Sequence, residues 1–213
     1  MSPLIEELLR HGPVVTDGAW GTQLQQRGLP SGDCPDAWNL SHASQVEEVP
    51  RAYVQAGSRI VLTNTFRANR LALASYGLAE SVAEINRKGV EISLRAAGEQ
   101  AMVFGSIGPS GKLLLTEEVS PDELQQAFEQ QAVALADAGA AGLVVETMSD
   151  LVEAKIALAA AKSTGLPVVA CMEFDSGKDL DRTLMGNSAQ SIASELTEAG
   201  ADVIGANCGQ GIS

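Results

Sequence analysis

The amino-acid sequence predicts an α/β protein built around a parallel β-sheet. Six short apolar runs, rich in β-branched residues, alternate with longer alanine-rich amphipathic segments. Apolar runs of this length are typical of strands that are covered on both faces, as strands of parallel sheets are. Repeated strand–helix alternation favours right-handed crossover connections between neighbouring strands. We therefore expect either an open doubly wound sheet or about six of the eight units of a (β/α)₈ barrel.

The six expected strands follow one another along the whole chain, at residues 13–17, 59–64, 102–106, 142–146, 167–173 and 203–208. The sixth strand ends at Cys208, and the sequence ends at Ser213. A barrel without its last two units would expose two parallel edges, which favour pairing with another chain. Self-association, or a complementary chain, is therefore one partner hypothesis.

The segments between the strands carry helix signals. Ser44 and Glu47 have the spacing of a capping box, although Pro50 then falls within the helix. The segment 120–123 combines a serine N-cap, a proline at the first helical position and a glutamate at the third, and Gly139 is a natural stop for that helix.

Two further helices have similar signals. Asp150 and Glu153 are expected to open a helix that ends before Gly165. Ser188 or Ser191 is expected to open the last helix, which should end at Gly200.

The composition excludes several classes of protein. With 27 acidic and 14 basic residues, the 213-residue chain has a formal net charge of −13. Such a chain repels phosphate backbones and anionic lipids, so we expect no nucleic acid and no membrane as partners. The sequence has neither a bilayer-spanning apolar run nor the apolar core of a signal peptide, which predicts a cytoplasmic protein. Its three cysteines (Cys34, Cys171 and Cys208) are far apart, which favours thiols or metal ligands over a disulfide framework.

Polar side chains follow the apolar part of each expected strand. These polar ends are Asp17, Thr63-Asn64-Thr65, Ser106, Glu146-Thr147, Glu173 and Asn207-Cys208. The carboxyl ends of parallel strands face one mouth, where chemistry collects in barrels and in doubly wound sheets. Any one of these residues could be only a helix cap or a loop anchor. A carboxylate, an amide and a thiol at the same rim favour a binding site, because buried polar groups need partners.

Six motifs at these positions resemble one protein family. They are DGAWGTQLQ at 17–25, DCPDAWN at 33–39, LTNTF at 62–66, GSIGPSG at 105–111, VVETMSDLVEA at 144–154 and GANCGQG at 205–211. In this order the chain resembles the zinc-dependent homocysteine S-methyltransferases. That family includes the homocysteine-binding module of cobalamin-dependent methionine synthase and the betaine and S-methylmethionine enzymes. The resemblance implies a (β/α)₈ barrel fold and one homocysteine-binding domain over residues 1–213, which lacks the last two units.

The resemblance also implies roles for particular residues. Cys208 matches the first zinc-binding cysteine of the family, and Asp17 and Glu146 match acidic residues around the amino group of homocysteine. All substrate-binding positions carried over in this way are Asp17, Gly18, Ala19, Asn64, Thr65, Glu146 and Asn207. The backbone at 18–19 matches the segment near the substrate carboxylate, and no residue is assigned a catalytic role.

The function implied is methyl transfer to the zinc-activated thiol of homocysteine, which forms methionine. The expected partners are homocysteine and a methyl donor, and the resemblance does not distinguish methylcobalamin or methylfolate, S-methylmethionine and betaine as donors. The expected cofactor is zinc, but the family's other two zinc cysteines form an adjacent pair at the last strand, and this sequence has no such pair. We therefore expect weak zinc binding by these 213 residues.

Two alternatives stay open. The first is a non-catalytic truncated homologue, or half of a split barrel, that binds a small amino acid or a complementary chain. The second is a different α/β barrel enzyme. An aldolase would need a Schiff-base lysine, and no expected strand end offers one.

Overall fold

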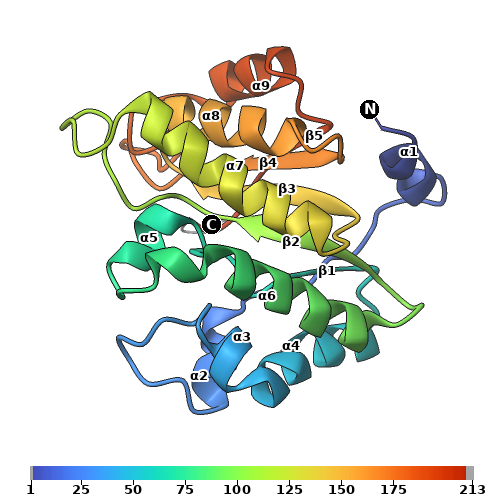
Figure 1. Cartoon of the computed structure of the whole chain (residues 1–213). Helices are drawn as coiled ribbons and strands as arrows, with labels where there is room; N and C mark the ends of the chain where they lie inside the picture. The colour runs from blue at the N-terminus through green and yellow to red at the C-terminus, as the bar shows by residue number, and fades with distance from the viewer. Residues whose placement is uncertain (1, 210–213) are drawn as a thin grey trace.

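A parallel β-sheet forms the centre of the molecule. A computed structural model describes residues 2–209, and within them five strands pair in sequence order, every pair parallel. The strands are β1 (Ile60–Leu62), β2 (Met102–Ile107), β3 (Gly142–Met148), β4 (Val168–Met172) and β5 (Val203–Ala206). The predicted α/β fold with a parallel sheet is thereby confirmed (Figure 1).

The first expected strand, residues 13–17, forms only an isolated parallel bridge between Thr16 and Ile60. Three backbone hydrogen bonds still hold the segment beside β1: Arg59 N and Ile60 N donate to the Val15 carbonyl, and Asp17 N donates to the Ile60 carbonyl. The Val15 side chain is 62% exposed, so this apolar run is not covered on both faces as a central strand would be. The segment thus reaches the sheet edge without extending the ladder.

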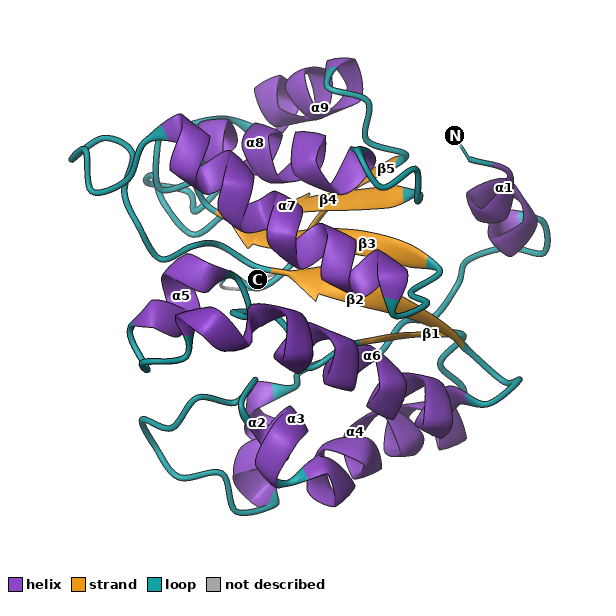
Figure 2. Ribbon diagram, in the orientation of Figure 1, coloured by secondary structure: helices purple, strands orange, loops and turns teal. Residues whose placement is uncertain are grey.

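The helices that connect the strands pack in a row over one face of the sheet, whereas the first helix packs through Ile5 against Ile60 and Phe104 on the other face. The long helices are α4 (Ala43–Gln55), α6 (Val82–Ala97), α7 (Pro121–Asp137), α8 (Leu151–Lys162) and α9 (Ala189–Glu198). The short ones are α1 (Pro3–Leu9), α2 (Gly21–Gln26), α3 (Trp38–Ser41), α5 (Arg70–Ala74) and the 3₁₀ turn η1 (Ala79–Ser81). Figure 2 shows α6, α7 and α8 side by side in front of the strands, and α4 packs against α6. Within residues 2–209, no helix combines the length and the apolar character needed to cross a bilayer.

Several helix caps agree with the sequence signals. Ser120 caps α7 in a full capping box: its Oγ accepts from Glu123 N, and the Glu123 carboxylate accepts from Ser120 N. Asp150 caps α8 and Ser188 caps α9. Each cap satisfies backbone N–H groups that have no partner inside the helix.

One cap prediction was wrong. Ser44 does not cap α4, because the helix already begins at Ala43 and the Ser44 hydroxyl donates to Gln45. Glu47 instead pairs with Arg51 and Arg95. Glu153 does lie in the first turn of α8, as expected, and its buried carboxylate accepts from the backbone N of Ser110, 2.7 Å away.

The two faces of the sheet differ in burial. Along β4, Val168, Ala170 and Met172 are buried under the helices, whereas Val169 and Cys171 are half-buried. In β3, Val145 is likewise buried and Glu146 is half-buried. Successive side chains of a strand point to opposite faces. The face away from the row of long helices therefore carries Glu146 of β3 and Cys171 of β4. The main core lies on the helix side, around Phe128, Leu143 and Met172.

Candidate functional site

The Glu146 carboxylate is the centre of the candidate site at the carboxyl ends of the strands. The Ser106 hydroxyl, from β2, donates to its Oε1 at 2.5 Å. The Asn207 side-chain amide, which follows β5, donates to its Oε2 at 2.9 Å. Burial raises the pKa of Glu146, and these two hydrogen bonds oppose the rise. Side chains from three strand ends thus converge on one carboxylate.

A β-bulge in β3 positions this carboxylate. Between Val145 and Met148 the ladder with β4 loses register, so that β3 contains one extra residue. A bulge bends its strand and re-aims a side chain. The N–H of Thr147, inside the bulge, donates to Asn207 Oδ1 at 2.8 Å. The Asn207 amide therefore binds both residues of the bulge, and its own backbone N–H donates to the Met172 carbonyl.

Two residues of the site have positive φ angles. Thr147 has φ of 58° and Cys208 has φ of 57°. The left-handed region is unfavourable for a β-branched residue such as threonine, and such strain clusters at functional sites. The two residues meet at the rim, where Thr147 Oγ1 lies 3.5 Å from Cys208 Sγ. The Cys208 thiol is exposed.

Asp17 faces the same mouth from the edge of the sheet. Its Oδ2 accepts from Leu62 N at 2.8 Å and from Trp20 Nε1 at 2.9 Å. Burial raises the pKa of Asp17 to about 6, although both hydrogen bonds favour its ionised form. Its charge also contributes to the raised pKa of Glu146. Two carboxylates with raised pKa values, close enough for the charge of one to act on the other, are typical of a site that receives a cation or a proton.

The segment Gly18–Ala19 is held against helix α4 by Tyr53. The Tyr53 hydroxyl donates to the Ala19 carbonyl at 3.0 Å, and a Cβ added at Gly18 would lie 3.2 Å from that hydroxyl oxygen. A side chain at residue 18 would press on this contact. The sequence did not indicate Tyr53, because it lies in an ordinary amphipathic helix with no motif around it.

Asn64 and Thr65 are buried beneath the rim. The Asn64 amide donates to the Pro35 carbonyl at 2.7 Å and to Asn39 Oδ1 at 3.0 Å. The Thr65 hydroxyl donates to the Ser106 carbonyl at 2.8 Å. Their polar atoms join neighbouring loops, so these two residues support the mouth from inside the protein.

Gln131 of α7 is a second supporting residue that the sequence did not indicate. Its Nε2 donates to the Thr65 carbonyl at 2.7 Å and to the Ser106 carbonyl at 3.3 Å. Its Oε1 is buried without a hydrogen-bond partner. Gln131 thus ties together the ends of β1 and β2 directly below Ser106.

The thiols do not form a metal centre in the part of the chain that the structure describes. Cys34 is buried, with its Sγ 3.9 Å from Asp36, and Cys171 is half-buried in β4. Burial, together with the charge of Glu146, raises the pKa of Cys171 to about 11, which disfavours the thiolate that binds metal. Among residues 2–209, no three His, Cys, Asp or Glu side chains gather closely enough to hold a metal ion. A zinc site needs three or four protein ligands, so the described residues do not fit zinc.

Comparison with known proteins identifies the family. The family model for homocysteine S-methyltransferase matches residues 14–213. The chain is 29% identical to methionine synthase of Mycobacterium tuberculosis (strain ATCC 25618 / H37Rv) over 223 residues, which cover 96% of this chain and 18% of that protein. It is 28% identical to betaine–homocysteine S-methyltransferase 1 of Bos taurus over 211 residues, covering 96% of this chain and 50% of that protein. The chain therefore spans half or less of the length of these two relatives.

A solved structure supports the fold. The metallated form of the homocysteine methyltransferase MmuM from Escherichia coli superposes with a TM-score of 0.81 at 22% identity, over 96% of this chain and 77% of that one. This likeness places the parallel sheet and its helices in a TIM-barrel-like α/β fold, and the resemblance read from the six motifs is confirmed. The chain belongs to the homocysteine S-methyltransferase family.

Proposed function

We propose that this chain binds homocysteine at the mouth formed by Asp17, Glu146 and Asn207 and serves methyl transfer to its sulfur. The observation that carries the proposal is the Glu146 carboxylate, held by Ser106 and Asn207 and facing the charge of Asp17. Two carboxylates at the same end of the sheet suit the ammonium group of an amino acid. Each charge-assisted hydrogen bond of this kind contributes about 1.5–3 kcal/mol.

The proposed site would bind the substrate in a single orientation. Its ammonium would donate to Glu146 and Asp17, and its carboxylate would accept from the backbone N–H groups at Gly18 and Ala19, which Tyr53 holds in place. Its thiol would then point toward the rim at Cys208. Methyl transfer forms a sulfur–carbon bond as the thiol gives up its proton to solvent, while the bond from methyl to donor breaks and its electron pair leaves with the donor. Asn64 and Thr65 support this mouth from below.

The proposal also includes activation of the substrate thiol by zinc. The relatives imply it, and one solved homologue is described as metallated. In this chain only Cys208 is in place as a ligand among the described residues, and one thiolate does not make a zinc site. We therefore assign no step to a metal. The domain assignment 1–213, the number of barrel units and the cytoplasmic location remain predictions.

The proposal is tested by comparing homocysteine with its analogue that lacks the amino group. Calorimetric titration should show an affinity at least about tenfold higher for homocysteine, because the analogue has no ammonium group to pair with the two half-buried carboxylates. Homoserine, in which a hydroxyl replaces the thiol, is the control for the other end of the substrate. Equal affinities for homocysteine and the analogue would contradict the ammonium site.

Self-association, or pairing with a complementary chain, remains a prediction. Sedimentation velocity at increasing concentration tests it, since a constant monomer mass would contradict pairing between copies.

A further inference from the structure

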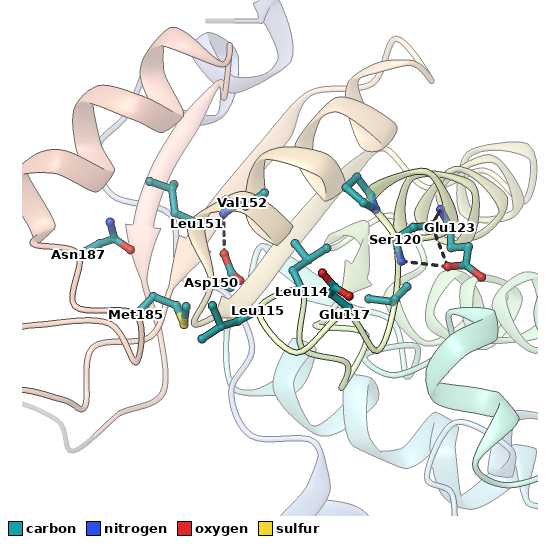
Figure 3. A pocket seen from close by; sticks show the side chains of 12 residues that line it. Leu114, Leu115, Glu117, Ser120, Glu123, Asp150, Leu151, Val152, Met185 and Asn187 are labelled. Carbon is teal, nitrogen blue, oxygen red and sulfur yellow. Dashed lines mark hydrogen bonds between the residues drawn. The ribbon is translucent and has the colours of Figure 1, made fainter.

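An apolar groove lies outside the candidate site, at the same end of the sheet. It has a volume of about 760 Å³ and lies between the loop before α7, the start of α8 and the loop after β4 (Figure 3). Its apolar lining residues are Leu114, Leu115, Val119, Pro121, Leu151, Val152 and Met185. None of them takes part in the hydrogen-bond network around Glu146.

The groove exposes several large apolar side chains to solvent. Leu115 is 77% exposed, Val152 56% and Met185 40%, and Leu113 and Leu184 beside them are also exposed. Leu115, Val152 and Met185 come from three separate segments and line the same groove (Figure 3). Contiguous exposed apolar patches commonly mark an interaction surface.

The charged residues that line the groove are all acidic, and the one basic neighbour that acts on them, Arg70, lies outside the lining and helps to lower the pKa of Glu123. The only charged lining residues are Glu117, Glu123 and Asp150. Hydrogen bonds from the backbone and hydroxyl of Ser120 lower the pKa of Glu123, which keeps it ionised. The N-termini of α7 and α8 contribute about half a positive charge each. Three carboxylates outweigh this, so the rim has a net negative charge.

The shape of the walls favours a helix as the occupant. A bound strand needs a row of free backbone groups at a sheet edge. Two walls of the groove are instead the first turns of α7 and α8. Backbone N–H groups there already donate to capping side chains, to Ser120 in α7 and to Asp150 in α8. An apolar groove between helix ends accepts the apolar face of an amphipathic helix.

A second copy of this chain is a poor occupant on electrostatic grounds. A symmetric dimer would place the same patch of both copies face to face. Glu117, Glu123 and Asp150 of each copy would then meet their own equivalents, in a chain with a net charge of −13.

We propose that this groove is a docking site for a basic amphipathic helix of another protein. The apolar face of the helix would pack on Leu115, Val152 and Met185, and its lysines or arginines would pair with the acidic rim. The inference is independent of methyl transfer, because it uses no residue of the proposed substrate site.

The test uses a fluorescein-labelled peptide of about 18 residues, or about five helical turns, with leucines along one face and lysines elsewhere. A second peptide replaces every lysine with glutamate, and a third has the same composition in scrambled order. Anisotropy titrations with the 213-residue chain should give a Kd of about 1–50 μM for the basic peptide, increasing with salt. The acidic and scrambled peptides should bind at least about tenfold more weakly.

Variants of exposed residues locate the site without removing core side chains. The double variant Leu115→Ser, Met185→Ser should weaken binding of the basic peptide about tenfold or more, and Glu117→Lys should weaken it several-fold. The matched controls are Leu40→Ser and Glu99→Lys, which change exposed residues away from the groove and should leave the Kd unchanged. Thermal melts confirm that all variants are folded.

Several outcomes would overturn the proposal. They are no binding of the basic peptide at about 500 μM, equal binding of the acidic peptide, or an unchanged Kd in the double variant. A concentration-dependent dimer that Leu115→Ser abolishes would assign the groove to a second copy instead.

Discussion

At the scale of single residues, Glu146 combines burial with specific partners. A carboxylate at the end of an apolar strand would be costly without hydrogen bonds, and Ser106 and Asn207 supply them. The sequence already singled out Glu146, Asp17, Asn207 and Cys208, because each is a polar residue directly after an apolar run. It did not indicate Tyr53, because a tyrosine in an amphipathic helix is usual.

We predict that Glu146→Gln lowers the affinity for homocysteine about tenfold or more and changes the melting temperature little. Glutamine keeps the shape, and its Oε1 can accept from the Asn207 amide while its own amide N–H donates to the Ser106 hydroxyl, but it removes the negative charge that attracts the ammonium. Calorimetry and a thermal melt measure the two effects on the same sample. An unchanged affinity with a lowered melting temperature would assign Glu146 a structural role.

A second residue-scale prediction concerns Cys208. The 213-residue chain should bind zinc weakly and below equimolar stoichiometry, because Cys208 has no neighbouring ligands among the described residues. Metal analysis after dialysis against zinc measures the stoichiometry, with Cys208→Ser as the matched variant. Tight equimolar zinc that survives in Cys208→Ser would show that other residues form the site.

At the scale of elements, the site depends on how three strand ends are joined. The β3 bulge at Glu146 and Thr147 is not visible in the sequence, since VVETM reads as one regular strand. A bulge arises from register between strands distant in sequence, which local patterns do not encode. Helix caps were predictable at Ser120, Asp150 and Ser188, where the signal is local. The failure at Ser44 has a local cause, because α4 begins one residue earlier.

Helix α7 supports the site through Gln131. We therefore predict that a change at Gln131 affects substrate binding more than the stability of the fold. Gln131→Met should weaken homocysteine binding several-fold while stability changes by only about 1 kcal/mol. The variant loses two hydrogen bonds to the carbonyls of Thr65 and Ser106, but it also removes the unpaired buried Oε1. The expected loss of binding comes from a looser Ser106, which donates to Glu146.

The matched variant for this prediction is Gln131→Glu. It places a carboxylate, which only accepts hydrogen bonds when ionised, against two carbonyl oxygens, and it should destabilise the fold strongly. Calorimetry and urea unfolding separate binding from stability in both variants. Full affinity in Gln131→Met would show that α7 does not position the site.

At the scale of the whole molecule, basic side chains lie mostly in surface ion pairs, whereas several acidic side chains are removed from solvent. Much of the basic complement is used in surface ion pairs, such as Arg27–Glu48 and Lys155–Glu195, each of which contributes little to stability. The carboxyls with raised pKa values are either buried, as Asp36 and Glu153 are, or half-buried, as Asp17 and Glu146 are. The fold therefore holds several acids in places that disfavour their ionised form.

This distribution predicts that the chain is more stable near pH 5 than near pH 7. Asp36 is 2% exposed, and burial raises its pKa from 3.8 to about 6. Between these two values the unfolded chain ionises Asp36 while the folded chain keeps the proton, so stability falls as pH rises through this window and levels off above it. A shift of this size corresponds to about 1 kcal/mol lost between pH 5 and pH 7 for Asp36 alone.

Urea unfolding at both pH values measures the effect, with Asp36→Asn as the variant. The asparagine keeps an oxygen that can accept from Arg67 N, as Asp36 Oδ1 does at 3.0 Å, and it does not ionise. Its pH-dependent loss of stability should therefore be about 1 kcal/mol smaller than that of the wild type. Both proteins are then measured again at high salt. Salt screens the repulsion between surface charges of a chain with net charge −13 far more than it affects a buried carboxyl, so the contribution of Asp36 can be separated from that repulsion. If the variant and the wild type lose equal stability between pH 5 and pH 7, Asp36 is not the group that titrates.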